Sequence, residues 1–215
     1  MPELPEVETL RQALVRLIQG KCLEEVLFHR SSLRFPIPRK QLSREMKGQT
    51  LGEITRKGKY LLFHFPSGAM LLHLGMSGRM MQSDRLESVE VHTHATFHFS
   101  PDVILHFIDP RRFGCILWVP SGHGHFLLNH LGPDPFESGV IAERMKRSAY
   151  KCKGPIKAFL MNAKRIAGVG NIYACEALFQ ARINPNRPAN RLSLKAWETL
   201  LNELRKTLKK SIASG

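Results

Sequence analysis

Hydrophobic residues near the start of the chain recur at helical spacing. Val7, Leu10, Leu14 and Leu17 fall on one face of a helix, and Gly20 ends the pattern. The spacing predicts a helix over residues 5–19.

After this helix the pattern changes to short strand-like runs. Most of them are separated by Gly, Pro, Ser or Asp, as the turns of an antiparallel sandwich or barrel require. The pattern therefore predicts an N-terminal β-sandwich domain over residues 1–120. Its expected strands cover residues 22–29, 52–57, 60–65, 69–74, 95–99, 103–108 and 115–119.

Residues 121–139 are rich in Gly, Pro, Ser and His, which is typical of a linker. Helical spacing then returns, so residues 140–215 are expected to form a second, helical domain. Ser193 is a suitable N-cap for the last helix. The chain as a whole is predicted to be an α+β protein. The helices expected in the second domain cover residues 140–146, 155–162, 171–181 and 193–212.

The charge of the chain is strongly positive. Its 32 Lys and Arg against 18 Asp and Glu give a net charge of +14 and a pI of about 10.1. Such a surplus favours a polyanionic partner, with nucleic acid as the leading candidate. The sequence shows neither a signal peptide nor an apolar run of about 20 residues. We therefore expect a cytoplasmic, nucleoid-associated protein without a membrane partner. We also expect it to be a monomer.

The four cysteines do not suggest a metal centre. Cys22, Cys115, Cys152 and Cys175 are scattered, and none belongs to a C-x-x-C pair. Reduced thiols in the core are the better interpretation, and we expect no metal site and no cofactor in this chain.

The second residue of the chain is Pro2, which becomes an N-terminal secondary amine if Met1 is removed. An α-amine has a pKa of roughly 7.7–8.0, so part of it is unprotonated at neutral pH and can form a Schiff base with a carbonyl carbon. The carboxylates of Glu3 and Glu6 lie within one helical turn and can transfer protons. The structural alternative is an ordinary helix start, where Pro and Glu are both common.

Several turns carry basic or apolar side chains. Lys59 precedes a strand and can reach a phosphate, although Lys at a strand edge also blocks edge pairing. Met76 lies in a Gly-flanked tip, and Arg111 and Phe113 lie on a turn between strands. On a basic protein, apolar tips can insert between base pairs and Arg can contact a base edge. A core methionine and a plain turn with solvated arginines are the alternatives.

The stretch 167–173 opens a predicted helix with two glycines followed by Asn171. Backbone N–H groups at such a helix start can bind phosphate, and Lys164 and Arg165 add positive charge just before it. The pattern is weakly specific by itself.

Taken together, these segments resemble the formamidopyrimidine-DNA glycosylase family, bacterial enzymes that excise oxidised purines from DNA. The resemblance runs in order from Pro2 to about Gly215. Leu4 is typical of the oxidised-purine branch, since the oxidised-pyrimidine branch usually has Gly there. The motifs are PELPEVE at 2–8, GKYLL at 58–62, HLGMSG at 73–78, DPRRFG at 109–114, HLGPDP at 130–135 and GVGNIYA at 168–174.

The resemblance implies a base excision repair glycosylase with AP lyase activity on damaged double-stranded DNA. Pro2 matches the nucleophile that attacks the sugar C1′ and forms a Schiff base, which leads to β,δ-elimination. Glu3 matches the acid that helps open the deoxyribose ring, and Glu6 matches a supporting carboxylate. Lys59 matches a lysine near the lesion and completes the expected catalytic set.

The resemblance also implies DNA contacts. Met76, Arg111 and Phe113 match the trio that fills the void left by a flipped base, with Arg111 facing the orphaned cytosine. Asn171 matches a phosphate-binding side chain of the helix-two-turn-helix domain, expected over 140–215. The expected DNA-binding residues are His73, Met76, His92, Arg111, Phe113, Lys153 and Asn171.

The sequence departs from the family pattern at its end. The family continues with a loop over the flipped base and a zinc finger with paired cysteines, and this chain stops at Gly215, before both. A fragment and a natural variant both fit this departure. Two other functions stay open, an oxidised-pyrimidine glycosylase and a DNA-binding module without full glycosylase activity. The Met76, Arg111 and Phe113 trio argues against the first.

Overall fold

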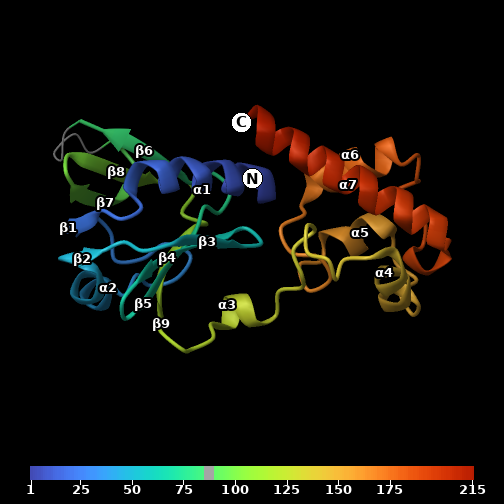
Figure 1. The fold of residues 1–215 in the computed structure, drawn as a ribbon, viewed down its shortest axis with the longest axis horizontal. Helices are drawn as coiled ribbons and strands as arrows, with labels where there is room; N and C mark the ends of the chain where they lie inside the picture. Colours follow the sequence, from blue (N-terminus) through green and yellow to red (C-terminus); the bar gives the residue numbers. More distant parts are fainter. Residues whose placement is uncertain (85–89) are drawn as a thin grey trace. The chain divides into compact units, whose positions relative to one another are not determined.

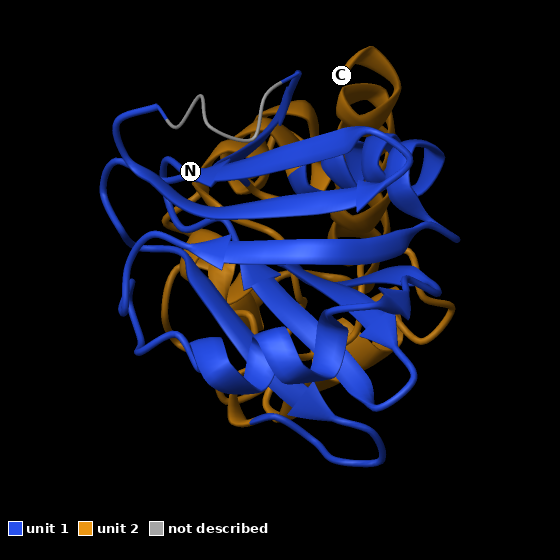
Figure 2. Ribbon diagram, turned by 90° about the vertical axis from the view of Figure 1, so that its left-hand side faces the viewer, with its two compact units in different colours: residues 1–2, 7–125 blue, residues 3–6, 126–215 orange. Residues whose placement is uncertain are grey.

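The computed structural model describes residues 1–84 and 90–215 (Figure 1). The chain forms two compact units, coloured separately in Figure 2. The first unit contains Met1–Pro2 and Val7–His125, and the second contains Glu3–Glu6 and Phe126–Gly215. The division cuts helix α1 (Leu4–Ile18), whose first turn is grouped with the second unit.

The first unit contains two antiparallel sheets. The five-stranded sheet has the order β2-β1-β7-β8-β6, and the four-stranded sheet has the order β3-β4-β5-β9. The strands of the first sheet are β1 (Cys22–Phe28), β2 (Gln49–Thr50), β6 (Arg79–Ser83), β7 (Thr93–Ser100) and β8 (Val103–Ile108). Those of the second are β3 (Ile54–Lys57), β4 (Tyr60–Phe65), β5 (Gly68–His73) and β9 (Cys115–Pro120).

One hydrophobic core joins both sheets of the first unit with the apolar side chains of helix α1. Val7, Leu14 and Ile18 of α1 belong to the same buried cluster as Phe63 and Phe107 of the strands. In β4 the burial alternates residue by residue, because successive side chains of a strand point to opposite faces. The helical period of α1 and the alternation of the strands thus produce the predicted sandwich.

Three elements of the first unit were not predicted. Among the described strands, β6 lies at the edge of its sheet and pairs with β8 alone, and most of its side chains are exposed and show no apolar alternation. Helix α2 (Arg39–Met46) buries only Leu42 and Met46 among charged residues. Strand β2 has two residues, too few for a pattern.

The second unit is helical, as its pattern predicts. Its core forms around α7, whose Trp197, Leu200, Leu204 and Leu208 are completely buried. The hydroxyl of Ser193 accepts the N–H of Ala196 and caps α7. The helices are α3 (Phe126–Asn129), α4 (Ala142–Ala149), α5 (Ile156–Met161), α6 (Asn171–Gln180), the 3-10 turn η1 (Ala189–Arg191) and α7 (Leu194–Ser214).

Helix α3 falls within 121–139, which composition alone marks as a linker. Its Leu127 and Leu128 are buried, and this single short turn carries too few apolar positions for a helical period. Within the described parts of the chain, no helix has both the length and the apolar character needed to cross a membrane.

Candidate active site

The side chain of Glu3 is fixed by the start of helix α6. It is 2% exposed, and both of its oxygens accept backbone N–H groups. Gly170 donates to Oε2 at 2.8 Å, Ile172 donates to Oε1 at 2.9 Å, and Tyr173 donates to Oε2 at 3.4 Å. These donors have no partner inside the helix, and a carboxylate is favoured at the positive end of the helix dipole. Glu3 is therefore the cap of α6, a role that its place in the sequence does not reveal.

Gly168 allows the first turn of α1 to approach α6. The N–H of Leu4 donates to the Gly168 carbonyl at 3.1 Å. Gly168 has a φ of +89°, and a Cβ there would lie 2.8 Å from Leu4 Cδ1. A side chain at residue 168 would therefore displace Leu4 and the adjoining Glu3.

Glu6 and Tyr173 extend this network. Glu6 Oε2 accepts the N–H of Glu3 at 2.7 Å, and Glu6 Oε1 accepts the hydroxyl of Tyr173. The same hydroxyl lies 2.7 Å from Ser211 Oγ on α7. Burial and the hydrogen bond to Glu6 raise the pKa of Tyr173 to about 12, so the phenol stays protonated at neutral pH. Sequence reasoning missed Tyr173 and Ser211, although Tyr173 belongs to the GVGNIYA motif.

Pro2 directly precedes Glu3 and is partly buried. The main chain next to Pro2 is held at three of the four residues that follow it. Glu3 is held through its carboxylate and its N–H, Leu4 through its N–H, and Glu6 through its carboxylate. The segment that carries the candidate nucleophile is therefore anchored by hydrogen bonds from Glu3 onward.

A cavity of about 410 Å³ in the first unit brings several predicted residues together. Met76 and Phe113 are 40% and 46% exposed, so both present apolar side chains to solvent. This exposure excludes the alternative of a core methionine at Met76. The cavity is lined by Met1, Arg34, His73, Gly75, Met76 and Phe113.

His73 lies in this cavity as a neutral ring. Its Nδ1 accepts the N–H of Gly75 at 3.0 Å, and its ring lies 4.6 Å from the ring of Tyr60. Burial, followed by the positive charges of Arg34 and Lys59, lowers the pKa of His73 to about 4. The ring therefore offers a donor at Nε2 rather than a positive charge at neutral pH.

Lys59 and His92 lie on turns of the first unit. Lys59 belongs to the two-residue turn between β3 and β4, where Lys57 pairs with Tyr60 and Gly58 has a φ of +60°. Glycine at the first position of such a turn is a standard hairpin solution. His92 is exposed just before β7, and its carbonyl accepts the N–H of Asp109 at 3.1 Å.

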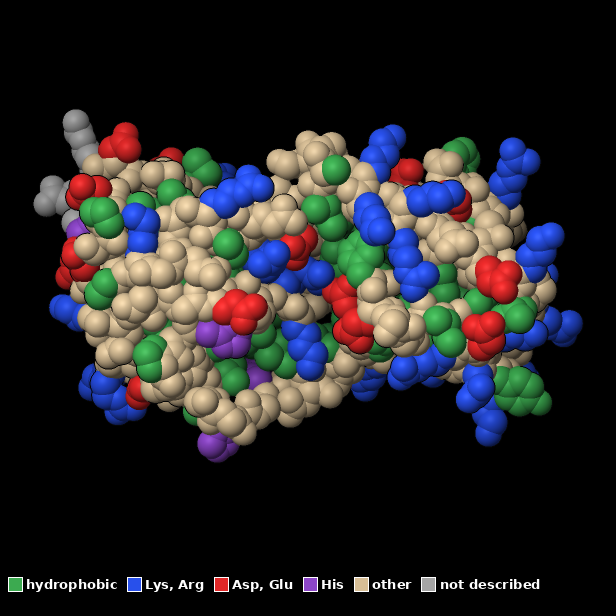
Figure 3. Space-filling model, viewed as in Figure 1, with side chains coloured by type: hydrophobic (Ala, Val, Ile, Leu, Met, Phe, Trp, Pro, Cys, Tyr) green, Lys and Arg blue, Asp and Glu red, His purple; other side chains and the backbone are tan. Residues whose placement is uncertain are grey.

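Lys153 and Asn171 belong to the second unit, where both are exposed. Lys153 lies just before α5, and Asn171 is the first residue of α6, beside the N–H groups that Glu3 binds. Residues 126–215 hold 16 of the 32 Lys and Arg but only 6 of the 18 Asp and Glu. Ten of the fourteen net positive charges therefore belong to this part, and Figure 3 shows Lys and Arg over its drawn face.

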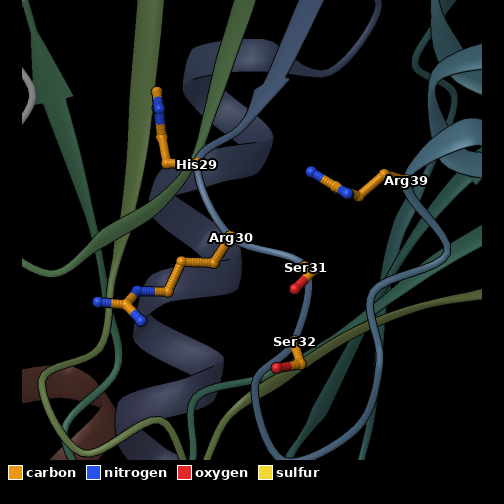
Figure 4. A pocket seen from close by; sticks show the side chains of 5 residues that line it. All are labelled: His29, Arg30, Ser31, Ser32 and Arg39. Atoms are coloured by element: carbon orange, nitrogen blue, oxygen red, sulfur yellow. The ribbon is translucent and has the colours of Figure 1, made fainter.

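A second hollow in the first unit also has a volume of about 410 Å³ (Figure 4). His29, Arg30, Ser31, Ser32 and Arg39 line it, and all five are exposed, so it is an open surface feature. Within residues 1–84 and 90–215, no group of three or more His, Cys, Asp or Glu side chains is arranged to hold a metal ion.

Two family models match the chain. Residues 1–116 match the formamidopyrimidine-DNA glycosylase N-terminal domain, and residues 131–215 match the formamidopyrimidine-DNA glycosylase H2TH domain. Among curated relatives, the formamidopyrimidine-DNA glycosylase of Acidithiobacillus ferrooxidans is 41% identical over all of this chain and 79% of its own length. The enzyme of that name from Psychromonas ingrahamii is 42% identical with the same coverage.

Solved structures of the Lactococcus lactis enzyme are also similar. One, bound non-covalently to DNA containing an AP site, has a TM-score of 0.91 and 30% identity over 98% of this chain and 82% of that chain. Another, a mutant in complex with DNA containing Fapy-dG, has the same TM-score and identity over 99% of this chain and 79% of that chain.

Proposed function

This chain belongs to the formamidopyrimidine-DNA glycosylase family, whose members are glycosylases and AP lyases of base excision repair, and we propose that it removes oxidised purines from double-stranded DNA. The proposed lesions are 8-oxoguanine and formamidopyrimidines. The names of the curated relatives and the Fapy-dG complex of the Lactococcus lactis enzyme support this choice.

The proposed mechanism uses the amine of Pro2 after removal of Met1. The damaged nucleotide leaves the stack, because its reactive carbon cannot be reached inside a duplex. The Pro2 nitrogen bonds to C1′, the glycosidic bond breaks with its electrons going to the base, and the sugar ring opens to a cationic Schiff base. Loss of a C2′ proton, whose bonding electrons move into this electron sink, expels the 3′ phosphate, and loss of the C4′ proton then expels the 5′ phosphate.

The observation that carries the proposal is the anchoring of Glu3 next to Pro2. Three N–H groups of the α6 start hold the Glu3 carboxylate, so a proton-transfer group is fixed one residue from the candidate nucleophile. Glu6 supports it through the N–H of Glu3.

The remaining predicted residues are proposed DNA contacts. Lys59, His92, Lys153 and Asn171 are suited to phosphates, and His73 is suited to donate a hydrogen bond from its neutral ring. The exposed apolar side chains of Met76 and Phe113, with Arg111, would fill the place of the flipped base. The chain is proposed to act as a monomer at the nucleoid, and the absence of a cofactor stays a prediction.

Borohydride trapping tests the mechanism. The protein should form a covalent adduct with duplexes that contain 8-oxoguanine or an abasic site, and peptide mapping should place the adduct on Pro2. Lys59→Arg, which keeps the charge but not the amine, should still be trapped. An adduct on a lysine would contradict the role of Pro2.

The same assay separates the competing functions. An oxidised-pyrimidine glycosylase would prefer a thymine glycol duplex over the 8-oxoguanine duplex. A DNA-binding module would bind the abasic duplex and yield no trapped adduct. Either result would replace the proposed function.

A further inference from the structure

The tip that carries Met76 and the tip that carries Arg111 and Phe113 are joined by one side chain, Asp109. Asp109 is completely buried. Its Oδ1 accepts the hydroxyl of Ser77 at 2.6 Å, and its Oδ2 accepts the N–H of Gly114 at 2.8 Å. A buried carboxylate is costly unless it is hydrogen-bonded, and here each bond goes to a different tip.

The hydroxyl of Ser77 adds a second link between the same tips. It donates to Asp109 and accepts the N–H of Arg111 at 3.2 Å. A hydroxyl has one donor and two acceptor lone pairs, so both bonds form at once. The main chain of Arg111 is thereby tied to Ser77, the residue that follows Met76.

Two glycines allow the tips to touch through their backbones. A Cβ on Gly75 would lie 2.4 Å from the nitrogen of Gly114, and Gly75 has a φ of +63°. A Cβ on Gly114 would lie 2.6 Å from the His73 carbonyl oxygen. Since no side chain fits at this contact, the distance between the tips is set by backbone and by Asp109.

Asp109 is itself held in place by the neighbouring sheet. Its N–H donates to the His92 carbonyl at 3.1 Å, and its carbonyl accepts from His94 Nε2 at 2.8 Å and from the N–H of Arg112 at 3.1 Å. Above it, the Arg111 guanidinium lies 4.9 Å from the centre of the Phe113 ring. Contacts therefore support the turn from its buried base to its exposed end.

We propose that Asp109, acting through Ser77, is a positioning residue that makes the two tips into one preformed wedge. The inference rests on the proposed void-filling function of Met76, Arg111 and Phe113. Ordering two separate tips at the moment of base flipping would cost conformational freedom, whereas a linked wedge has already lost it on folding. Asp109 is assigned no contact with the reacting atoms.

Ser77→Ala and Ser77→Thr form the principal test, because Thr keeps the hydroxyl that Ala removes. Excision from an 8-oxoguanine duplex is compared with borohydride trapping on a single-stranded abasic site, where no base needs to be replaced. Ser77→Ala should lower kcat/KM on the duplex roughly 3- to 10-fold, the effect of one lost hydrogen bond, and leave single-strand trapping unchanged. Ser77→Thr should restore duplex excision.

Thr93→Val is the matched control. Thr93 is a buried residue of β7, which pairs with β8, the strand that leads to Asp109. Its hydroxyl makes no hydrogen bond to any described atom. Removing this hydroxyl should leave the ratio of duplex to single-strand activity unchanged. Asp109→Asn replaces one of the two carboxylate oxygens with an amide nitrogen, which cannot accept a hydrogen bond. Either the Ser77 hydroxyl or the Gly114 N–H then loses its acceptor, so this variant should lower that ratio at least as much as Ser77→Ala.

A double-mutant cycle measures the linkage directly. The effects of Met76→Ala and Phe113→Ala on duplex excision should be non-additive in the natural protein and additive in the Ser77→Ala background. Unchanged coupling in that background would overturn the positioning role, as would equal losses on duplex and single strand. If Met76→Ala and Phe113→Ala leave duplex excision intact, the void-filling function fails first and the inference fails with it.

Discussion

At the scale of single residues, Glu3 illustrates how one carboxylate can serve both folding and chemistry. Both of its oxygens accept N–H groups of the α6 start, yet a carboxylate offers about four lone-pair sites. Three N–H groups occupy three of these sites, so one site on Oε1 remains for proton transfer without loss of the cap. Glu3 therefore connects the ordering of the N-terminus to the proposed reaction.

Glu3→Gln should damage both roles. Its amide nitrogen would face a backbone N–H of α6, so we expect the free energy of unfolding to fall by about 1–3 kcal/mol. Base excision should slow by a factor on the order of 10²–10⁴. Glu198→Gln, an exposed acid on α7, is the control for the lost charge. An excision rate equal to that of the natural protein would remove Glu3 from the mechanism.

His73 should make stability depend on pH. Its pKa is about 4 in the folded chain and near 6.5 when unfolded, so below pH 6.5 the unfolded chain binds the extra proton. This contribution is fully present above pH 6.5 and is lost as the pH falls towards 4, by up to about 3 kcal/mol. His73→Gln should flatten denaturant unfolding curves across this window, and the exposed His123→Gln should not. An unchanged pH profile in His73→Gln would contradict the pKa.

At the scale of elements, the contact of the α1 start with the loop before α6 fixes the candidate active site. The contact depends on Gly168, whose carbonyl and missing Cβ admit Leu4. Helix propensity plays no part in it, because Gly168 lies outside both helices. The position of Glu3 is therefore decided by a loop that is distant in sequence.

Gly168→Ala should destabilise the protein by about 1–3 kcal/mol, because Ala at positive φ is strained and its Cβ meets Leu4. Thermal unfolding measures the loss. Gly154→Ala is the matched control, since a Cβ there meets nothing within 4 Å, and it should change stability by no more than about 0.5 kcal/mol. Equal effects of both substitutions would show that Leu4 yields to the new side chain.

The tip formed by Arg111 and Phe113 should read the base opposite the lesion. The planar donor fork of Arg111 suits the edge of an unpaired cytosine, and a bidentate contact contributes about 1–3 kcal/mol of discrimination. Arg111→Ala should therefore erode the preference for cytosine over adenine opposite 8-oxoguanine. Arg112→Ala, the exposed neighbour, should preserve it. A preference unaltered in Arg111→Ala would assign the reading of this base elsewhere.

At the scale of the whole molecule, the net charge of +14 is the dominant property. Ten of these charges belong to residues 126–215, where most Lys and Arg side chains are exposed. Such a distribution favours non-specific attraction to a polyanion before any base is recognised. It acts on association, whereas the fold depends on the two hydrophobic cores.

DNA affinity should accordingly depend steeply on salt. The logarithm of the association constant should fall linearly with the logarithm of salt concentration, with a slope of about −0.9 for each neutralised phosphate. Fluorescence anisotropy with an abasic duplex between roughly 50 and 200 mM salt measures the slope. Lys153→Gln should reduce the magnitude of this slope by about 0.9, the value for one phosphate contact. Affinity independent of salt would exclude phosphate contacts as the main source of binding.

The longer helices and most strands could be predicted from the sequence because their periods are local. The run from Val7 to Leu17 and the alternation of β4 each bury one face in a large core. Strand β6 could not be predicted in this way, since an edge strand buries little and owes its form to pairing with β8.

The sequence by itself determined the two-part α+β organisation, the positive charge and, through its motifs, the family. These follow from local periods, composition and short segments. Only the tertiary structure decided that Glu3 caps α6, that Tyr173 donates to Glu6 and that Asp109 joins two tips. These contacts join residues 32 to 170 positions apart, and buried polar groups take whichever partners the folded backbone brings within hydrogen-bond distance.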